Sequence, residues 1–388
     1  MSVFGWGKRM ENSFGGVVFG IILAAGAVVM LFWNEGRAVK RYKDLNEGAA
    51  IVVSIAADKV DPANEAKLVH FSGKTATDSP VEDTVFGFSE MAIKLIRDAE
   101  MYQWVETISH RRTSGNGEEK EVTYKKEWRK DLVDSSHFVQ GEGRRNPGQM
   151  AYRSRTFTAP EVKLGAFTLP DFLVAKINNR EPYSITSLNR ASPEVKKNGK
   201  IGGSGVYFGS DPAAPKIGDI RVTFSVVRPG MTSVIAKQTG TTLARYPTHT
   251  GGTIDQLEIG TYGADAMFQM EQHRNKVLTW GMRVVGFFML GFGFSLLLGP
   301  LAAISSVIPL FGSIVGAGTR IIGFLLAAVV WTVTVALAWI YYRPLLGIGL
   351  LILTVGLLIV IAKKLFRGKQ RQAATAGGSD SSPPPFSP

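Results

Sequence analysis

The sequence predicts an α+β protein that is anchored in a membrane by four helices and carries a large, mostly antiparallel β-rich domain between the first and second helix. Three observations predict this class. Apolar residues are concentrated near the two ends of the 388-residue chain. The middle of the chain is more polar, and its apolar residues alternate with polar ones. Gly, Asn and Pro separate these alternating runs, as they do between strands of an antiparallel sheet.

The first predicted span follows a tail at residues 1–13 and covers residues 14–33, a run without a charged side chain. At about 1.5 Å per residue, this run can cross a hydrocarbon core roughly 30 Å thick. It is also longer than the apolar region of a cleaved signal peptide, about 7–15 residues, so we expect an uncleaved anchor. Gly16, Gly20 and Ala24 recur at every fourth position, which would let a second helix pack closely, although small residues are common in such spans anyway.

Three further spans are predicted near the C-terminus. A continuous helix over residues 264–301 should begin as a stalk and become the second span, and residues 321–342 and 345–362 should form the third and fourth. Residues 302–320 are apolar but broken by proline and glycine, so we expect a re-entrant or interfacial loop there. Residues 363–388 form a basic tail whose Gly-, Ser- and Pro-rich end is expected to be disordered.

An even number of spans places both termini on the same side of the membrane. The basic tail favours the cytoplasm for that side, so the domain at residues 34–263 is expected outside it. In a bacterium this is the periplasmic face of the inner membrane, and in a eukaryote it is the lumen of an organelle. The cations at residues 37–43, which follow the first span, favour the opposite orientation.

Strand patterns dominate the domain. Alternating residues on both sides of the turn Ser114–Gly117 predict a long hairpin with the arms Tyr102–Ile108 and Val122–Trp128. The same alternation predicts that Trp104 and Trp128 both face a core. Further predicted strands are Ile51–Ile55, Lys67–Gly73 and a pair around Arg228–Gly230 made of Asp219–Val227 and Ser233–Gln238.

Helices are sparser in the domain. Thr168 is a candidate N-cap for a short helix with Pro170 near its first turn and Ile177 on its apolar face. The segment Met91–Ala99 fits either a helix or a strand.

No local motif predicts a cofactor, a metal ion or a nucleic acid as a ligand. The chain has no cysteine, which excludes disulfides, thiolate nucleophiles and zinc–thiolate sites. The five histidines lack the H-x-H or H-x-x-x-H spacing of a local metal site. The glycines between residues 202 and 209 lack the spacing of a nucleotide-binding loop. A basic tail beside a hydrophobic helix is better explained by anionic lipid than by nucleic acid.

Polar residues gather at the outer ends of the first two spans. They are Asn34, Glu35 and Arg37 after the first span, and Glu271, His273, Arg274, Lys276 and Arg283 around the start of the second. One interpretation is that they bind lipid headgroups or perform acid–base chemistry on them. The catalytic candidates would then be Glu35, Arg37, Glu271 and His273. The simpler interpretation, which we favour, is that they are snorkelling anchors and exposed ion pairs that fix helix ends.

Five segments resemble the LUMA family, also called transmembrane protein 43. They are, in chain order, Leu31–Ala38, Leu68–Lys74, Glu100–Glu106, Tyr124–Trp128 and Asn275–Trp280. The likeness extends over residues 14–362 and does not include the tail. The resemblance implies four spans with a large lumenal domain between the first and second.

The resemblance also implies a function. Animal members lie in the endoplasmic reticulum and inner nuclear membrane, self-associate, organise membrane protein complexes and contact emerin and lamins. The absence of cysteine suggests a bacterial chain, which would have neither emerin nor lamins. The family offers no established catalytic residues to carry over.

We therefore favour a non-enzymatic integral membrane scaffold that forms homo-oligomers and has membrane lipids and other membrane proteins as partners. The alternative is a lipid-binding sensor or lipid-modifying enzyme that uses the polar clusters at the membrane boundary. A transporter is disfavoured, because the third and fourth predicted spans contain no ionisable side chain.

Overall fold

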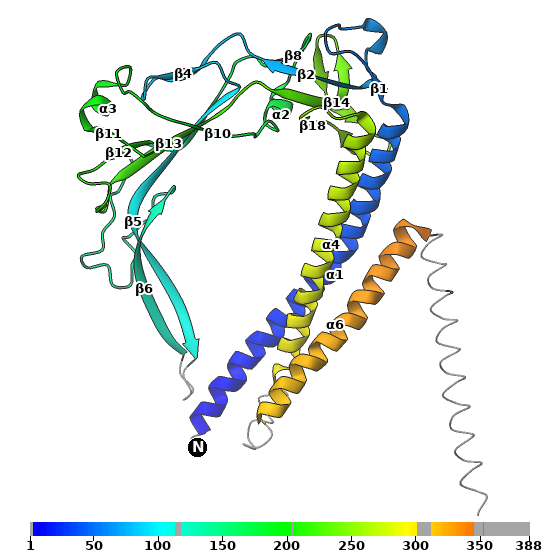
Figure 1. The fold of residues 1–388 in the computed structure, drawn as a ribbon. Coiled ribbons are helices and arrows are strands. Elements are labelled where there is room, and N and C mark those ends of the chain that lie inside the picture. Colours follow the sequence, from blue (N-terminus) through cyan, green and yellow to red (C-terminus); the bar gives the residue numbers. More distant parts are fainter. Residues whose placement is uncertain (1–2, 113–117, 204, 301–311, 345–351, 353–388) are drawn as a thin grey trace, which may run out of the picture. The chain divides into compact units, whose positions relative to one another are not determined.

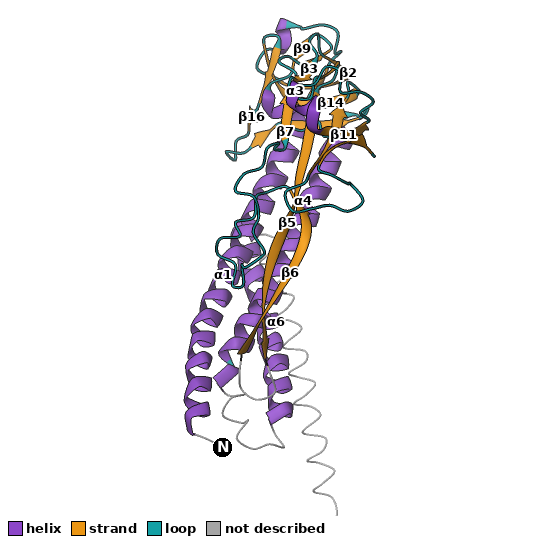
Figure 2. Cartoon of the chain, turned by 90° about the vertical axis from the view of Figure 1, so that its left-hand side faces the viewer, coloured by secondary structure: helices purple, strands orange, loops and turns teal. Residues whose placement is uncertain are grey.

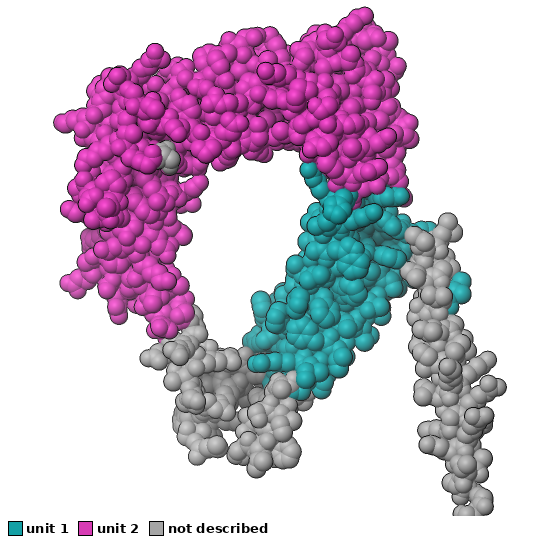
Figure 3. Space-filling view, viewed as in Figure 1, with its two compact units in different colours: residues 1–42, 273–388 teal, residues 43–272 magenta. Residues whose placement is uncertain are grey.

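The computed structural model describes residues 3–112, 118–203, 205–300, 312–344 and 352. The chain divides into two compact units, coloured separately in Figure 3. The helical unit comprises residues 1–42 and 273–388, and the β-rich unit comprises Lys43–Gln272. The predicted α+β class, with membrane helices and a large β-rich domain, is confirmed.

Within the described residues, three helices are long and apolar enough to cross a membrane. They are α1 (Val3–Ile51), α4 (Ala264–Leu297) and α6 (Gly312–Tyr342), labelled in Figure 1. The fourth predicted span, residues 345–362, lies outside the described residues apart from a single position. The predicted loop at residues 302–320 is described only from Gly312, where α6 already begins.

Helix α1 continues well beyond the apolar run that ends at Trp33. The residues after Trp33 include good helix formers and no proline, so nothing in the sequence ends the helix there. The strand predicted at Ile51–Ile55 is therefore wrong for the most part. Ile51 is the last residue of α1, and only β1 (Val53–Ser54) is a strand.

The first sheet of the β-rich unit closes on itself, because β14 pairs with β2 as well as with β15. Its ladders are antiparallel except β1–β2 and β9–β15. In spatial order its strands are β1, β2 (Leu68–Ala76), β8 (Lys163–Leu164), β9 (Phe167–Thr168), β15 (Thr242–Ala244), β14 (Met231–Thr239) and β18 (Gln256–Ile259).

The second sheet is wholly antiparallel in the described residues. Its main path is β11 (Gly199–Gly202), β12 (Gly205–Phe208), β13 (Ile220–Val227), β5 (Lys94–Arg112) and β6 (Glu118–Arg129). In addition, β10 (Glu181–Tyr183) pairs with β13 and β7 (Arg155–Thr158) pairs with β5.

Smaller elements complete the β-rich unit. Two short ladders join β3 (Val81–Asp83) to β4 (Phe88–Glu90) and β16 (Tyr246–Pro247) to β17 (Thr253–Ile254). The short helices are η1 (Pro62–Asn64), α2 (Asp171–Val174) and α3 (Pro193–Asn198).

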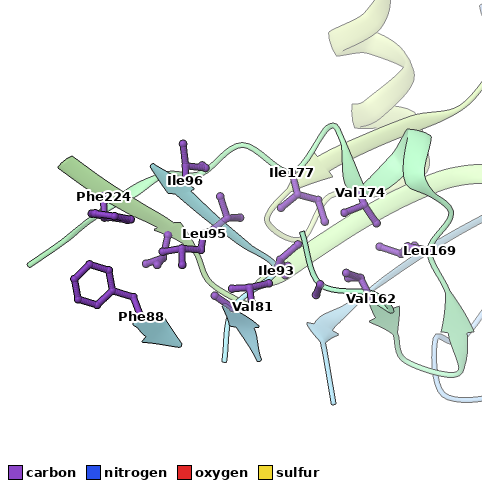
Figure 4. Close-up of a cluster of buried hydrophobic side chains, with 14 of the residues drawn as sticks. Val81, Phe88, Ile93, Leu95, Ile96, Val162, Leu169, Val174, Ile177 and Phe224 are labelled. Atoms are coloured by element: carbon purple, nitrogen blue, oxygen red, sulfur yellow. The ribbon is translucent and has the colours of Figure 1, made fainter. Parts of the chain in front are cut away.

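One extended hydrophobic core joins the two sheets, and Figure 4 shows part of it around Leu95, Ile93 and Phe224. It encloses an ion pair in which Arg97 Nη1 donates to Asp83 Oδ2 at 2.7 Å. The guanidinium of Arg97 also lies over the ring of Phe86, 5.2 Å from its centroid. A pair buried this deeply fixes strand positions, because neither charge tolerates loss of its partner.

The arms of the predicted hairpin are confirmed, and its turn, Ser114–Gly117, lies outside the described residues. Strands β5 and β6 form a long ladder in which Tyr102 faces Trp128 and Trp104 faces Lys126. The two strands run together as the long ribbon in Figure 2. The predicted core positions of Trp104 and Trp128 are wrong, because both side chains are only half-buried.

The core residues of β5 nearest to Trp104, Ala99 and Met101, lie on the opposite face of the strand. Alternation separates the two faces of a strand but does not say which is buried. Cations cover the two indoles instead: Lys126 Nζ lies 4.8 Å from the ring centroid of Trp104.

Two other predictions, each made from neighbouring residues, are wrong, because the strands involved pair with strands that are distant in the chain. Strands β13 and β14 exist where expected, but β13 pairs with β5 and β14 with β2, so the two strands belong to different sheets. Thr168 is not a helix cap. It lies in β9, its hydroxyl donates to Glu161, and Pro170 occupies the N-cap of α2 without a side-chain hydrogen bond. The ambiguous segment Met91–Ala99 is a strand from Lys94 onward.

Candidate functional site

A buried ion pair joins α1 and α4 in the helical unit. Glu35 on α1 is 2% exposed and Arg283 on α4 is 7% exposed. Arg283 Nε donates to Glu35 Oε1 at 2.6 Å, and its Nη2 donates to Oε2 at 2.8 Å. This two-point contact is the strongest geometry available to an arginine and a carboxylate. Each charge makes the burial of the other tolerable, because a single charge at this position would be unpaired and poorly hydrated.

Two tryptophans of α6 complete the arrangement. Trp339 Nε1 donates to Glu35 Oε2 at 2.9 Å, and Trp331 Nε1 donates to the backbone oxygen of Arg283 at 2.9 Å. The guanidinium also lies over the rings of Trp280 and Trp339, 4.7 and 5.5 Å from their centroids. Three helices therefore converge on one carboxylate–guanidinium pair.

A second polar layer lies beside the ion pair and again joins α1 to α4. Arg37 donates to Asn275 Oδ1 at 3.1 Å, to Thr279 Oγ1 at 3.2 Å and to Asn34 Oδ1 at 3.3 Å. Asn34, which is fully buried, donates from Nδ2 to the backbone oxygen of Thr279 at 3.1 Å. Asn275 Nδ2 donates to the backbone oxygen of Ala38 at 2.9 Å. The donors of Arg37 and Asn34 are thus directed at protein acceptors.

Glycines bring the helices close together elsewhere in the unit. A Cβ added to Gly20 would lie 2.8 Å from the backbone oxygen of Gly293, and one added to Gly293 would lie 3.1 Å from the backbone nitrogen of Ala24. Gly16 is less tightly packed, because a Cβ added to it would lie 3.9 Å from the side chain of Leu296. The three small residues singled out in the first span therefore all lie on the side of α1 that faces α4.

The structure brings together four of the eight predicted polar residues: Asn34, Glu35, Arg37 and Arg283. Of the other four, His273, Arg274 and Lys276 are exposed residues of the helical unit, whereas Glu271 belongs to the β-rich unit.

The sequence interpretation missed Asn275, Thr279, Trp331 and Trp339. A signal existed for the α4 residues, because Asn275, Thr279 and Arg283 recur at every fourth position and so form a polar stripe on an otherwise apolar helix.

Comparisons with known proteins identify the family. The sequence profile described as Transmembrane protein 43 matches residues 101–344. Transmembrane protein 43 of Rattus norvegicus is 34% identical over 357 residues, which cover 88% of each chain. The chain belongs to the transmembrane protein 43 family.

Other members of the transmembrane protein 43 family align over similar lengths. The Homo sapiens protein is 33% identical over 380 residues, covering 93% of this chain and 94% of its own. The Drosophila melanogaster homolog is 29% identical over 353 residues, covering 86% and 91%. No solved structure matches the chain.

The chemistry open to this family member at the helix junction is limited by its hydrogen bonds. Both oxygens of Glu35 already accept from Arg283 and Trp339, and the side chain is almost fully enclosed. A general acid or base must reach a substrate proton directly or through one water molecule. The geometry instead suits a structural role, in which these hydrogen bonds set the positions of α1, α4 and α6 along one another. We call the hydrogen-bonded group of Asn34, Glu35, Arg37 and Arg283 the polar lock.

The β-rich unit of this family member contains buried polar groups, but their hydrogen-bond partners belong to the unit itself. Burial raises the pKa of Tyr207, and its hydrogen bond to Asp219 raises that pKa further. Burial lowers the pKa of Lys94, whose Nζ donates to the backbone oxygens of Ala175 and Ile177. Among the residues that the structure describes, no group of three or more histidines and carboxylates could hold a metal ion.

The β-rich unit also has a surface hollow of about 910 Å³, formed by the loop that follows β6. Its lining is assembled within one stretch of chain, residues 132–148. Asn146 has a structural task there, because its side chain pairs with the backbone nitrogen and oxygen of Trp104 at 2.8 and 2.9 Å.

Proposed function

We propose that this transmembrane protein 43 family member is a non-enzymatic integral membrane scaffold that self-associates and organises other membrane proteins or membrane structure through its β-rich domain. The observation that carries the proposal is the enclosed Glu35–Arg283 pair. Glu35, the carboxylate that the enzyme alternative would use, has both of its oxygens hydrogen-bonded, to Arg283 and Trp339. Their geometry supports a role in holding helices rather than in turnover.

A scaffold needs a rigid membrane anchor, and two features of the helical unit supply one. The polar lock and the glycine contacts between α1 and α4 both fix the position of one helix along the other. The enzyme alternative needs Glu35 and Arg37 to be accessible together with His273. Glu35 is enclosed, and the donors of Arg37 are directed at Asn34, Asn275 and Thr279.

The proposal includes an orientation, with the β-rich domain on the extracytoplasmic face: the periplasm of a bacterial inner membrane, or the lumen of a eukaryotic organelle. Because the chain has no cysteine, single cysteines can be introduced cleanly. Ser136→Cys in the β-rich unit and Ser381→Cys in the tail should react with an impermeant thiol reagent from opposite sides. Labelling of both from one side would contradict the four-span topology.

Self-association is tested on the full-length chain in nanodiscs and in mild detergent. Native mass spectrometry should show a defined oligomer that persists on dilution. A monomer in both environments, at the concentrations found in the membrane, would refute self-association.

The non-enzymatic half of the proposal has its own test. Lipid mass spectrometry compares cells carrying empty vector, the unaltered protein and Glu35→Gln. We expect no lipid change that depends on Glu35. If the unaltered protein changes a lipid and Glu35→Gln abolishes that change, at equal protein level and equal oligomer size, the chain is an enzyme.

A further inference from the structure

Large aromatic side chains are exposed at corresponding levels of two antiparallel helices in the helical unit. Trp33 on α1 and Trp280 on α4 are each 58% exposed. The helices are antiparallel because Gly20 meets Gly293 whereas Asn34 meets Thr279. Exposed tryptophans at the end of an apolar span belong at the boundary between hydrocarbon and headgroups. The two indoles therefore mark the same membrane boundary.

Each tryptophan has a lysine on the same face of its helix, on the side toward the water. Lys276 precedes Trp280 by four residues, and Lys40 follows Trp33 by seven, spacings that place both partners along one helical face. At about 1.5 Å per residue, the Cα atoms of Lys276 and Lys40 lie roughly 6 and 10 Å beyond the tryptophans. The headgroup layer is about 5–7 Å thick on each side of the bilayer. The Cα of Lys276 falls at this layer. Lys40 lies beyond it, but its long side chain leans toward the N-terminus of its helix, and thus back toward Trp33, so its ammonium group can enter the layer.

Neither lysine is neutralised by the protein. Lys40 and Lys276 are exposed, and neither has an ion pair or side-chain hydrogen bond in the part of the chain that the structure describes. From residue 15 to 42 and from 273 to 300, the one acidic residue is Glu35, which is paired with Arg283.

The next acids along α1 belong to the β-rich unit and are also occupied. Asp44 accepts from the hydroxyl of Thr248 at 2.6 Å, and Glu47 lies 2.9 Å from His249 Nδ1. On α4 the next acid, Glu271, has an interaction of its own.

We infer that these two faces, Trp33–Lys40 and Trp280–Lys276, bind the headgroups of anionic phospholipids. Phosphate oxygens would accept from the lysine ammonium groups while the indoles lie at the boundary between the headgroups and the acyl chains. A net-negative headgroup is favoured over a zwitterionic one, because neither face carries a carboxylate to pair with a headgroup cation. The inference does not depend on self-association or on the scaffold role.

Tryptophan fluorescence in reconstituted vesicles tests the inference at the site itself. The full-length protein is placed in phosphatidylcholine vesicles that contain a small fraction of either brominated phosphatidylglycerol or brominated phosphatidylcholine as the quencher. Subtracting the signal of Trp33→Phe/Trp280→Phe isolates quenching at the two faces, so lipid bound by the basic tail does not contribute.

Brominated phosphatidylglycerol should quench the two tryptophans more strongly than brominated phosphatidylcholine. Each face loses its one lysine in Lys40→Gln/Lys276→Gln, so this preference should fall by about fivefold at each face, and added salt should reduce it in the unaltered protein. The charge-matched control Lys196→Gln/Lys197→Gln, at exposed positions of α3, should retain the full preference.

Equal quenching by the two lipids in the unaltered protein would overturn the inference. So would an unchanged preference in Lys40→Gln/Lys276→Gln. Oligomer size, measured on the same samples, reports separately on the scaffold proposal.

Discussion

Replacing Arg283 by methionine should destabilise the helical unit by about 3–5 kcal/mol, the cost of removing one partner from a buried ion pair. The substitution deletes both hydrogen bonds to Glu35 and the contacts of the guanidinium with the rings of Trp280 and Trp339. Glu35 would remain 2% exposed in the native packing with a single donor, Trp339 Nε1. The sequence alone suggested an exposed pair, for which the expected cost is about 0–1 kcal/mol.

A double-mutant cycle separates the pair from simple loss of packing. Glu35→Gln alone leaves the Arg283 charge unpaired and should also cost about 3–5 kcal/mol. The combined variant Glu35→Gln/Arg283→Met removes both charges of the pair, and the new amide oxygen can still accept from Trp339. It should therefore be less destabilised than the sum of the single variants by about 2 kcal/mol or more.

The assay is unfolding of the full-length protein in mixed micelles with increasing SDS, followed by circular dichroism. Each variant is compared with the unaltered protein at the same detergent concentration. Two small, additive effects of under about 1 kcal/mol would show that the pair behaves as a solvated surface contact, and would refute the structural argument.

The remaining predictions concern packing. Gly20→Val should lower the melting temperature in detergent, because its Cβ would lie 2.8 Å from the backbone oxygen of Gly293. The control is Gly26→Val, because a Cβ at Gly26 has open space around it. Equal losses of melting temperature in the two variants would contradict close packing of α1 against α4. Phe86→Ala should cost about 3–5 kcal/mol in the denaturant unfolding of the full chain, since Phe86 is fully buried. Trp104→Ala should cost only about 1–2 kcal/mol, because that ring is half-buried and its main partner is Lys126. A loss at Trp104 as large as at Phe86 would place it in a core after all.

The sequence predicts those parts of the fold that depend on nearby residues. The described spans follow from uninterrupted apolar runs, and the β5–β6 hairpin follows from alternation on both sides of a turn. Such local patterns do not identify which strands pair when the two strands are distant in the chain. Strand β14 follows β13 after only three residues, yet it pairs with β2, because the register of Ser233 against Ser72 is set by the closed first sheet.

The candidate site shows the same division. Residue type and position identified four residues as unusual: Asn34, Glu35, Arg37 and Arg283. Charged and amide side chains next to an apolar span are costly unless they have hydrogen-bond partners or a function. Their partners could not be derived from the sequence. The carboxylate of Glu35 is completed by Trp339, which is 304 residues away in the chain, and an indole at a span end is indistinguishable by sequence from an ordinary interfacial anchor.

Depth relative to the tryptophans explains why cations on one helix have different surroundings. Arg283 lies three residues from Trp280 on the apolar side, roughly 4–5 Å into the hydrocarbon level, and Lys276 lies four residues away on the water side. An unpaired charge at the depth of Arg283 has no water to solvate it, so it requires Glu35 and the indoles of α6. A charge at the depth of Lys276 is solvated by water and headgroups and needs no protein partner. Helix α4 therefore carries Arg283, which stabilises the packing of the three helices, and, two turns away, Lys276, which remains available to lipid headgroups.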